Sequence, residues 1–139
     1  MIRRFEKTDS DAVYEIERLS FTDPWSKDGI AAEADNALGT ALVYDDGGVA
    51  GYVFGDFDGE STYISRIAVH PDRRRQGIAA ALIEDLMSRT SRHVTLEVRQ
   101  SNTDAIAFYE KMGFVRECVR RGFYASPRED AIVMIHRSE

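Results

Sequence analysis

The stretch Tyr63-Ile-Ser-Arg-Ile-Ala-Val-His-Pro-Asp-Arg-Arg-Arg-Gln-Gly-Ile-Ala-Ala-Ala-Leu-Ile-Glu-Asp-Leu86 contains the features that decide the fold. Its first part, through Val69, is rich in β-branched and aromatic residues and predicts a buried strand. Pro71 ends that strand because it has no N–H for the sheet ladder. From about Arg75, apolar residues recur at helical spacing, at positions 78, 82, 83, 86 and 87. The sequence therefore predicts a strand, a short turn and a long amphipathic helix.

The turn between this strand and this helix has the features of an anion site. Three arginines, at positions 73 to 75, precede Gly77. Backbone N–H groups at a helix start lack partners, and the helix dipole favours negative charge there. Gly77 has no Cβ to keep an anion away from the backbone. The Gly-Lys-Ser/Thr ending of a P-loop and the three glycines of a Rossmann turn are both absent. The pattern predicts a phosphate site of another kind; a solvated basic helix start is the alternative.

Composition narrows the class of protein. The 139 residues predict one domain, 1–139, with 43% hydrophobic and 30% charged residues. No run of about 18 apolar residues predicts a membrane span, and the first residues do not resemble a secretory signal. The single cysteine, Cys118, favours a reducing cytoplasm. A net charge of −6 argues against direct nucleic-acid binding. It suits a cationic partner such as a basic peptide, or serves solubility alone.

The order of predicted elements gives an α+β fold. Strands are predicted at residues 2–5, 40–44, 49–57, up to 69, 93–99, 114–121 and 131–136, and four helices lie between them. The early strands are joined by tight turns and predict an antiparallel meander, whereas the long central helix predicts a parallel crossover. The last two strands are predicted to flank a longer loop through Gly122, Phe123, Tyr124 and Pro127. The prediction is a mixed, mostly antiparallel sheet of about seven strands flanked by about four helices.

Two residues are the main candidates for chemistry. Alternation in the strand 93–99 places Glu97 on the face opposite Val94 and Leu96. A carboxylate in a central strand is costly unless it is paired or functional, and the structural alternative is a network with Arg99 or Thr95. Tyr109, on the following helix, is either a proton donor or an amphipathic core residue.

Other candidates have plain structural alternatives. Asn102 fits a helix N-cap, Trp25 a core anchor and Tyr124 an ordinary loop aromatic. The three histidines lack metal-site spacing, so no metal is expected. Cys118 has no histidine nearby in sequence, which disfavours a cysteine nucleophile.

Several ordered blocks resemble one enzyme family. Arg74-x-x-Gly77-x-Ala79 resembles the acyl-coenzyme A pyrophosphate loop of the GNAT N-acetyltransferases. The block Leu96-Glu-Val-Arg-Gln-Ser-Asn-Thr-Asp-Ala-Ile-Ala-Phe-Tyr-Glu-Lys-Met-Gly-Phe114 resembles a signature of their RimI-like and archaeal protein N-terminal acetyltransferase branch. Residues 21–26 look like the branch's loop between the first two helices, and residues 129–134 like its final strand. The resemblance spans nearly the whole chain.

The resemblance implies roles for individual residues. Glu97 matches the general base and Tyr109 the general acid, and Trp25 and Tyr124 would border a peptide groove. The Val69 N–H would polarise the thioester carbonyl. The residues that would bind acetyl-coenzyme A (acetyl-CoA) are Ile67, Ala68, Val69, Arg74, Arg75, Gln76, Gly77, Ile78, Ala79, Ala80, Asn102 and Tyr109. One departure is Phe123, where the family often has a tyrosine, so one hydroxyl for the peptide backbone is missing.

The implied reaction is acetyl transfer from acetyl-CoA to the α-amine at a protein or peptide N-terminus, with a ribosomal protein as the natural substrate. An α-amine has a pKa of about 7.7–8.0 and is mostly protonated at neutral pH, so a base is needed. Two alternatives remain: an acetyltransferase for a small-molecule amine, and an acyl-CoA-binding module without catalysis.

Overall fold

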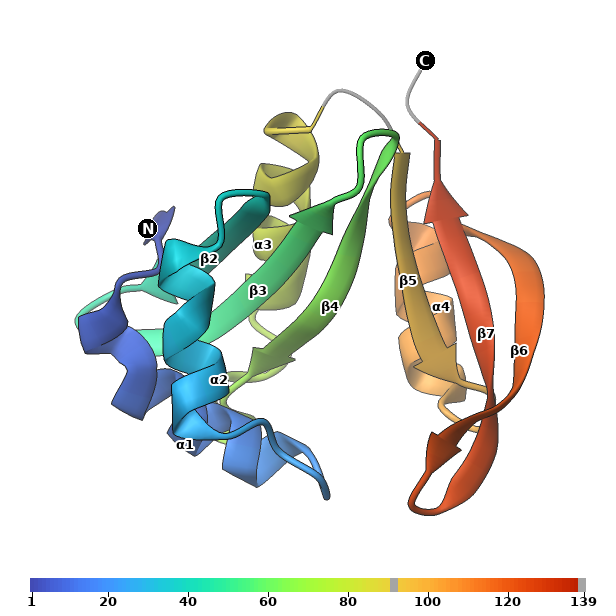
Figure 1. The fold of residues 1–139 in the computed structure, drawn as a ribbon, viewed down its shortest axis with the longest axis horizontal. Helices are drawn as coiled ribbons and strands as arrows, with labels where there is room; N and C mark the ends of the chain where they lie inside the picture. The colour runs from blue at the N-terminus through green and yellow to red at the C-terminus, as the bar shows by residue number, and fades with distance from the viewer. Residues whose placement is uncertain (91–92, 138–139) are drawn as a thin grey trace.

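Seven strands form one sheet in the computed structural model, which describes residues 1–90 and 93–137. Their order is β1-β2-β3-β4-β5-β7-β6, and every neighbouring pair is antiparallel except β4 with β5 (Figure 1). The strands are β1 (Ile2–Arg4), β2 (Gly39–Asp45), β3 (Val49–Phe57), β4 (Ser61–Val69), β5 (His93–Arg99), β6 (Val115–Ala125) and β7 (Arg128–His136). The helices are α1 (Ser10–Ser20), α2 (Lys27–Ala32), α3 (Ile78–Ser88) and α4 (Thr103–Lys111). The predicted mixed α+β architecture and its parallel crossover are confirmed.

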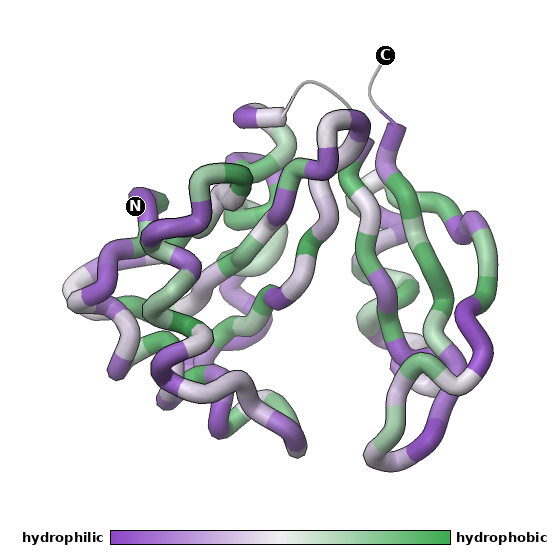
Figure 2. Tube along the Cα trace, in the orientation of Figure 1, coloured by the Kyte–Doolittle hydropathy of each residue, from purple (hydrophilic) through white to green (hydrophobic). Residues whose placement is uncertain are grey.

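Each face of the sheet carries two helices. On one face α1 and α2 bury Val13, Ile16 and Ile30 against Tyr52 and Phe54. On the other face, α3 and α4 cover a larger core. Its buried residues include Leu42, Val53, Leu82, Ile83, Leu86, Val94, Leu96, Ile106, Phe114 and Met134. Figure 2 shows the hydrophobic run along β7, which crosses this core. Burial of these side chains stabilises the folded state by about 25 cal/mol for each Å² of apolar surface removed from water.

The sheet splits between β4 and β5. These two strands pair only over Ser61–Tyr63 and His93–Thr95, and they diverge beyond that point (Figure 1). On the other side β4 stays paired with β3 as far as Val69. The His70 N–H donates to the Ala50 carbonyl at 2.8 Å. Because paired residues alternate in an antiparallel ladder, Val69 and Ile67 direct their own N–H and C=O groups away from β3, toward the split.

A β-bulge sets which β4 side chains face α1. Phe54 lies opposite Arg66 and Gly55 lies opposite Ile64, so Ser65 is the extra residue. The bulge shifts the alternation and places Arg66 on the same face as Tyr63. That face is the one that carries α1 and α2, because Phe54 belongs to their core.

Two predicted boundaries were wrong. The helix starts at Ile78 and not near Arg75, because Arg75 and Gly77 adopt left-handed backbone, with φ of 65° and 79°. The predicted loop through Gly122, Phe123 and Tyr124 belongs to β6, which continues to Ala125. Gly122, with φ of 62°, lies within an irregularity of the β6–β7 ladder, so this glycine marks a bulge rather than a strand end.

Candidate active site

An open cavity of about 530 Å³ lies where β4 parts from β5. Its walls come from the last residues of β4, the loop before α3, the first turn of α3, the inner side of α4 and the end of α1. Every residue predicted to bind acetyl-CoA lines it except Gln76. Four further lining residues were not among those predicted to bind acetyl-CoA: Ser20, Phe21, Phe108 and Arg73, although Arg73 was one of the arginines predicted to form the anion site. The cavity joins segments that are far apart in the chain.

The loop before α3 has backbone suited to an anion. A left-handed conformation at a residue other than glycine is uncommon, and Arg75 has φ of 65°. Gly77 is the N-cap of α3 and has φ of 79°. Turns of this type aim successive backbone N–H groups into one concavity. The first N–H groups of α3 add to it, since no intrahelical carbonyl precedes them.

The three arginines of this loop have different partners. Arg74 lies between cavity walls: its Nε donates to the Val69 carbonyl at 3.1 Å and a terminal nitrogen donates to Ser20 Oγ at 3.2 Å. The predicted Gln76 turns away, and its side-chain oxygen accepts from Arg73 Nε at 3.0 Å. Arg73 also forms a two-bond ion pair with Asp46. The Arg73 guanidinium holds the pKa of Asp46 below its usual range.

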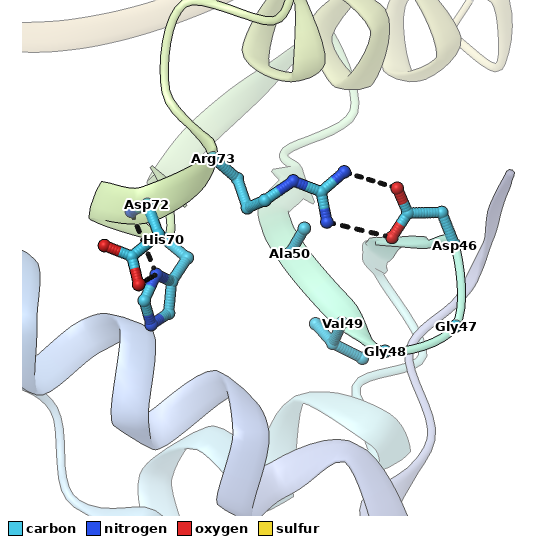
Figure 3. A pocket seen from close by; sticks show the side chains of 8 residues that line it. All are labelled: Asp46, Gly47, Gly48, Val49, Ala50, His70, Asp72 and Arg73. Atoms are coloured by element: carbon cyan, nitrogen blue, oxygen red, sulfur yellow. Dashed lines mark hydrogen bonds and ion pairs between the residues drawn. The ribbon is translucent and has the colours of Figure 1, made fainter.

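A second, smaller hollow of about 340 Å³ lies beyond Arg73. Figure 3 shows the Arg73 guanidinium facing the Asp46 carboxylate across it, between the β2–β3 turn and the loop after β4. His70 and Asp72 are close together at its other end, where His70 Nδ1 accepts from the Asp72 N–H at 3.1 Å. The ion pair ties the β2–β3 turn to the loop before α3, and so supports the wall of the larger cavity.

Glu97 lies at the split but on the opposite face from α4. Its side chain is only 6% exposed, and Arg120 Nε lies 3.5 Å from Oε2. Tyr63 donates its hydroxyl to Oε1. The structural alternative predicted that Glu97 contacts Arg99 or Thr95, and this was wrong. Arg99 instead pairs with Glu129 at 3.2 Å. A buried carboxylate with two partners from other strands is held at the point where β4 and β5 part.

Three tyrosines near the split have raised pKa values, and one of them, Tyr63, contacts the Glu97 carboxylate. Burial and the hydrogen bond to Glu97 raise the pKa of Tyr63. Burial and the nearby Tyr124 hydroxyl raise the pKa of Tyr109 to about 12. Burial and the Glu97 carboxylate raise the pKa of Tyr124, and the Arg99 and Arg66 guanidiniums lower it. Tyr124 thus lies within electrostatic reach of Glu97, of Tyr109 and of Arg66 across the split.

The remaining candidates, Asn102, Trp25 and Tyr124, each make a structural contact. Asn102 caps α4, its Oδ1 accepting from the Ala105 N–H at 3.2 Å, and it also lines the cavity. Trp25 stacks on Phe54 at 5.9 Å between ring centroids, so it anchors the core beneath α1 and α2. The ring of Tyr124 is covered by the Arg99 guanidinium at 4.2 Å. Neither Trp25 nor Tyr124 lines the cavity.

Sequence reasoning missed a buried ion pair beside this site. Glu17 of α1 is fully buried and pairs with Arg66 of β4 at 2.7 Å. The signal was present: Glu17 follows Val13 by four residues and Ile16 by one, on the helix face that enters the core. Tyr63 was missed because its partner Glu97 lies 34 residues away in the chain.

The site has the parts of an acyl-transfer centre. It offers an anion cradle, backbone donors at an unpaired strand edge, a buried carboxylate and a protonated phenol. Among the described residues, histidine, cysteine and carboxylate side chains form no group of three that could hold a metal ion. None of the described helices has the length and hydropathy to cross a membrane.

Comparisons with known proteins agree with this chemistry. The profile of the acetyltransferase (GNAT) family matches residues 10–114. The chain is 34% identical to the [ribosomal protein bS18]-alanine N-acetyltransferase of Escherichia coli, over 96% of this chain and 94% of that protein. It is 35% identical to a putative enzyme of the same name from Bacillus subtilis, over 96% of this chain and 92% of that one.

Two solved structures also resemble this chain closely. The crystal structure of the Escherichia coli ribosomal-protein-S18-alanine N-acetyltransferase superposes with a TM-score of 0.89, covering 99% of this chain and 92% of that one. That of Ard1 from Thermoplasma volcanium superposes with a TM-score of 0.91 at 29% identity, covering 100% and 97%. The chain belongs to the GNAT family of acetyltransferases. It is an N-acetyltransferase, and its family takes the acetyl group from acetyl-CoA.

Proposed function

We propose that this enzyme acetylates the α-amine at the N-terminus of a protein, and that a ribosomal protein is its substrate. The observation that carries the proposal is the buried Glu97 at the split of the sheet, where Tyr63 of β4 and Arg120 of β6 contact its carboxylate. The resemblance to the Escherichia coli enzyme, whose name specifies the alanine of ribosomal protein bS18, supports this substrate class. The lone Cys118, exposed on β6, fits a reaction in the reducing cytoplasm.

The residues of the cavity fit acetyl-CoA. The loop from Arg74 to Ala80 would bind the pyrophosphate through backbone N–H groups and guanidinium charge. The outward backbone groups of Ile67 and Val69 would pair with the pantetheine arm as a strand would. Asn102 and Phe108, on the other wall, would enclose that arm. This arrangement would direct the thioester toward the split between β4 and β5.

Glu97 would act as the base. It would take a proton from the incoming ammonium, directly or through a water molecule, and the neutral amine would then attack the thioester carbon. The C–N bond forms as the C–S bond breaks, and the nitrogen, positively charged after the attack, releases its second proton to the departing thiolate or to solvent to leave the neutral amide. The Val69 N–H, which points to the split, would hold the negative charge that develops on the carbonyl oxygen.

Tyr109 would serve the leaving sulfur. A pKa of about 12 keeps its hydroxyl protonated at neutral pH. A thiol has a pKa of about 8.5, so full transfer of the phenol proton is uphill. Tyr109 would therefore stabilise the developing thiolate chiefly as a hydrogen-bond donor, and the thiolate would take its final proton through Tyr109 or from solvent.

A panel of peptides tests the proposal. The enzyme is incubated with acetyl-CoA and with a peptide that starts with the first residues of bS18, and mass spectrometry locates the acetyl group. Matched controls are the same peptide with a blocked N-terminus and a free internal lysine, and a set of small-molecule amines. Acetylation confined to the α-amine supports the proposal. Comparable acetylation of lysine or of a small amine contradicts it, and binding of acetyl-CoA without transfer to any amine would indicate a non-catalytic module.

A further inference from the structure

Glu17 is a charged side chain buried next to the proposed peptide site without a part in the chemistry described above. Its carboxylate accepts hydrogen bonds from the Tyr52 hydroxyl, from the Trp25 N–H at 2.8 Å and from Arg66 Nε at 2.8 Å. Tyr52 is itself fully buried, and Arg66 is 17% exposed. The carboxylate is therefore completely enclosed by donors from β3, from β4 and from the segment that follows α1.

Arg66 extends this network to the same segment, residues 21–26, which joins α1 to α2. A terminal nitrogen of Arg66 donates to the Asp23 carbonyl at 3.0 Å. Its guanidinium lies 3.8 Å from the centre of the Phe21 ring and 5.4 Å from that of Trp25. One ion pair thus fixes three residues of a segment that has no regular secondary structure. Without it, few other hydrogen bonds would hold this segment in one conformation.

The segment 21–26, which the ion pair holds, lies next to the acetyl-CoA cavity. Phe21 lines the acetyl-CoA cavity beside Val69 and Tyr109. In Figure 1 the segment and the β6–β7 hairpin lie on opposite sides of the point where the ribbons of β4 and β5 diverge. Arg66 is close enough to Tyr124 on that hairpin to act on it electrostatically. The segment therefore borders the acetyl-CoA cavity through Phe21, and Arg66 links it electrostatically to Tyr124; a peptide bound on this side of the split would lie against it.

A buried ion pair is a poor device for stability alone. Taking two charges out of water costs much of what their attraction returns, and apolar replacements are often as stable. Arginine is suited to a different task, because its planar fork binds a carboxylate and a carbonyl at once while its face stacks on an aromatic ring. All three contacts are present at Arg66.

We propose that Arg66, held by Glu17, is a positioning residue for the peptide substrate: it fixes Phe21 and Trp25 as the wall against which the first residues of the peptide lie. This inference rests on the proposed function. Loss of the pair should release the wall, weaken peptide binding and leave both acetyl-CoA binding and the chemical step nearly intact.

The test uses Arg66→Lys, Glu17→Gln and the double variant Glu17→Gln/Arg66→Met. Lysine keeps the charge that Glu17 needs but lacks the fork, so Arg66→Lys should fold. Its KM for the peptide should rise by about tenfold or more, the effect of one lost charge-assisted contact. Its kcat at saturating peptide and its Kd for acetyl-CoA should change by less than about twofold. Glu15→Gln, which breaks the exposed Glu15–Arg18 pair of the same helix, is the matched control.

The double variant separates positioning from folding. It removes both charges at once, so it should regain the melting temperature that the single variant Glu17→Gln loses. Its KM for the peptide should stay high. Recovery of both the melting temperature and the peptide KM would reduce the pair to a structural element and overturn the proposal, as would an unchanged peptide KM in Arg66→Lys.

Trp25 gives a readout that needs no substrate, because it is the single tryptophan of the chain. Acrylamide should quench its fluorescence more strongly in Arg66→Lys and in the double variant than in the wild type or in Glu15→Gln. Unchanged quenching contradicts the inference even if the enzyme acetylates peptides. If the wild type acetylates no peptide N-terminus, the proposed function fails, while the quenching still reports whether Arg66 fixes the segment.

Discussion

The hydroxyl of Tyr63 on β4 donates a hydrogen bond to the carboxylate of Glu97 on β5. Tyr63 is the last residue of β4 that pairs with β5, and Glu97 lies two residues beyond its pairing partner Thr95. The bond therefore spans the two strands just where they separate. It holds the carboxylate at the entrance of the split, where an amine and a thioester from opposite sides of the sheet would meet.

Replacing Tyr63 with phenylalanine should weaken this arrangement without removing the base. Glu97 would keep Arg120 at 3.5 Å but lose a buried donor. That hydroxyl fixes the orientation of the carboxylate, so its loss should leave the base less well placed to take a proton from the substrate amine. We expect kcat/KM to fall on the order of tenfold near neutral pH, the worth of one hydrogen bond to a charged group. The measurement is kcat/KM with a peptide that has a free N-terminus; an unchanged value would mean that Tyr63 only packs.

Replacing Glu97 with glutamine should have a larger effect that depends on pH. The variant keeps the shape and removes the base, and should lose about 10²–10⁴ in rate near neutrality. Above the α-amine pKa of about 8 the substrate arrives neutral, so the deficit should shrink. The measurement is kcat/KM against pH with a peptide that has a free N-terminus. Wild-type activity near neutrality would make Glu97 a structural carboxylate.

Tyr109→Phe should give a deficit of a different form. The ring continues to pack on Phe114, 5.7 Å away between centroids, and only the donor to the leaving sulfur is lost. Because the pKa of Tyr109 is about 12, its hydroxyl stays protonated throughout the assay range. The deficit should therefore be independent of pH up to about 10, while binding of acetyl-CoA remains near that of the wild type. A deficit that shrinks as the amine deprotonates would place Tyr109 with Glu97 on the substrate side.

The alkaline limit of stability should depend on buried tyrosines. The pKa values of Tyr52, Tyr63 and Tyr109 are all raised above the ordinary value of 10. Above pH 10 the unfolded chain releases phenol protons that the folded chain retains, so the free energy of unfolding should fall as pH rises. Below about pH 10 these groups contribute no pH dependence. Absorbance of tyrosinate near 295 nm should rise for these residues only together with loss of the circular dichroism signal.

Parts of this site could be predicted from the sequence because they are local. The strand, turn and helix of residues 63–88 and the alternation that buries Val94 and Leu96 lie within single elements. The contacts of Glu97 are different in kind. Tyr63 and Arg120 reach it from other strands. A one-residue bulge at Ser65 also decides that Arg66 of β4 faces α1. Periodicity cannot reveal such a shift, which is why the Glu17–Arg66 pair also went unnoticed.

The loop before α3 allows a test of the cofactor assignment that separates charge from backbone shape. Arg74→Ala removes a guanidinium that lies against the cavity wall, and should weaken binding of acetyl-CoA by about 1–3 kcal/mol. Gly77→Ala tests the backbone shape of the loop. A Cβ at this position would meet no atom within 4 Å, but φ of 79° is unfavourable for alanine, at about 1–2 kcal/mol. Gly48→Ala is the matched control, since its Cβ also meets open space and its φ is not in the left-handed range. Calorimetry with coenzyme A should show weaker binding for Arg74→Ala and for Gly77→Ala but not for Gly48→Ala. Equal affinities in all three variants would show that this loop does not bind the phosphates.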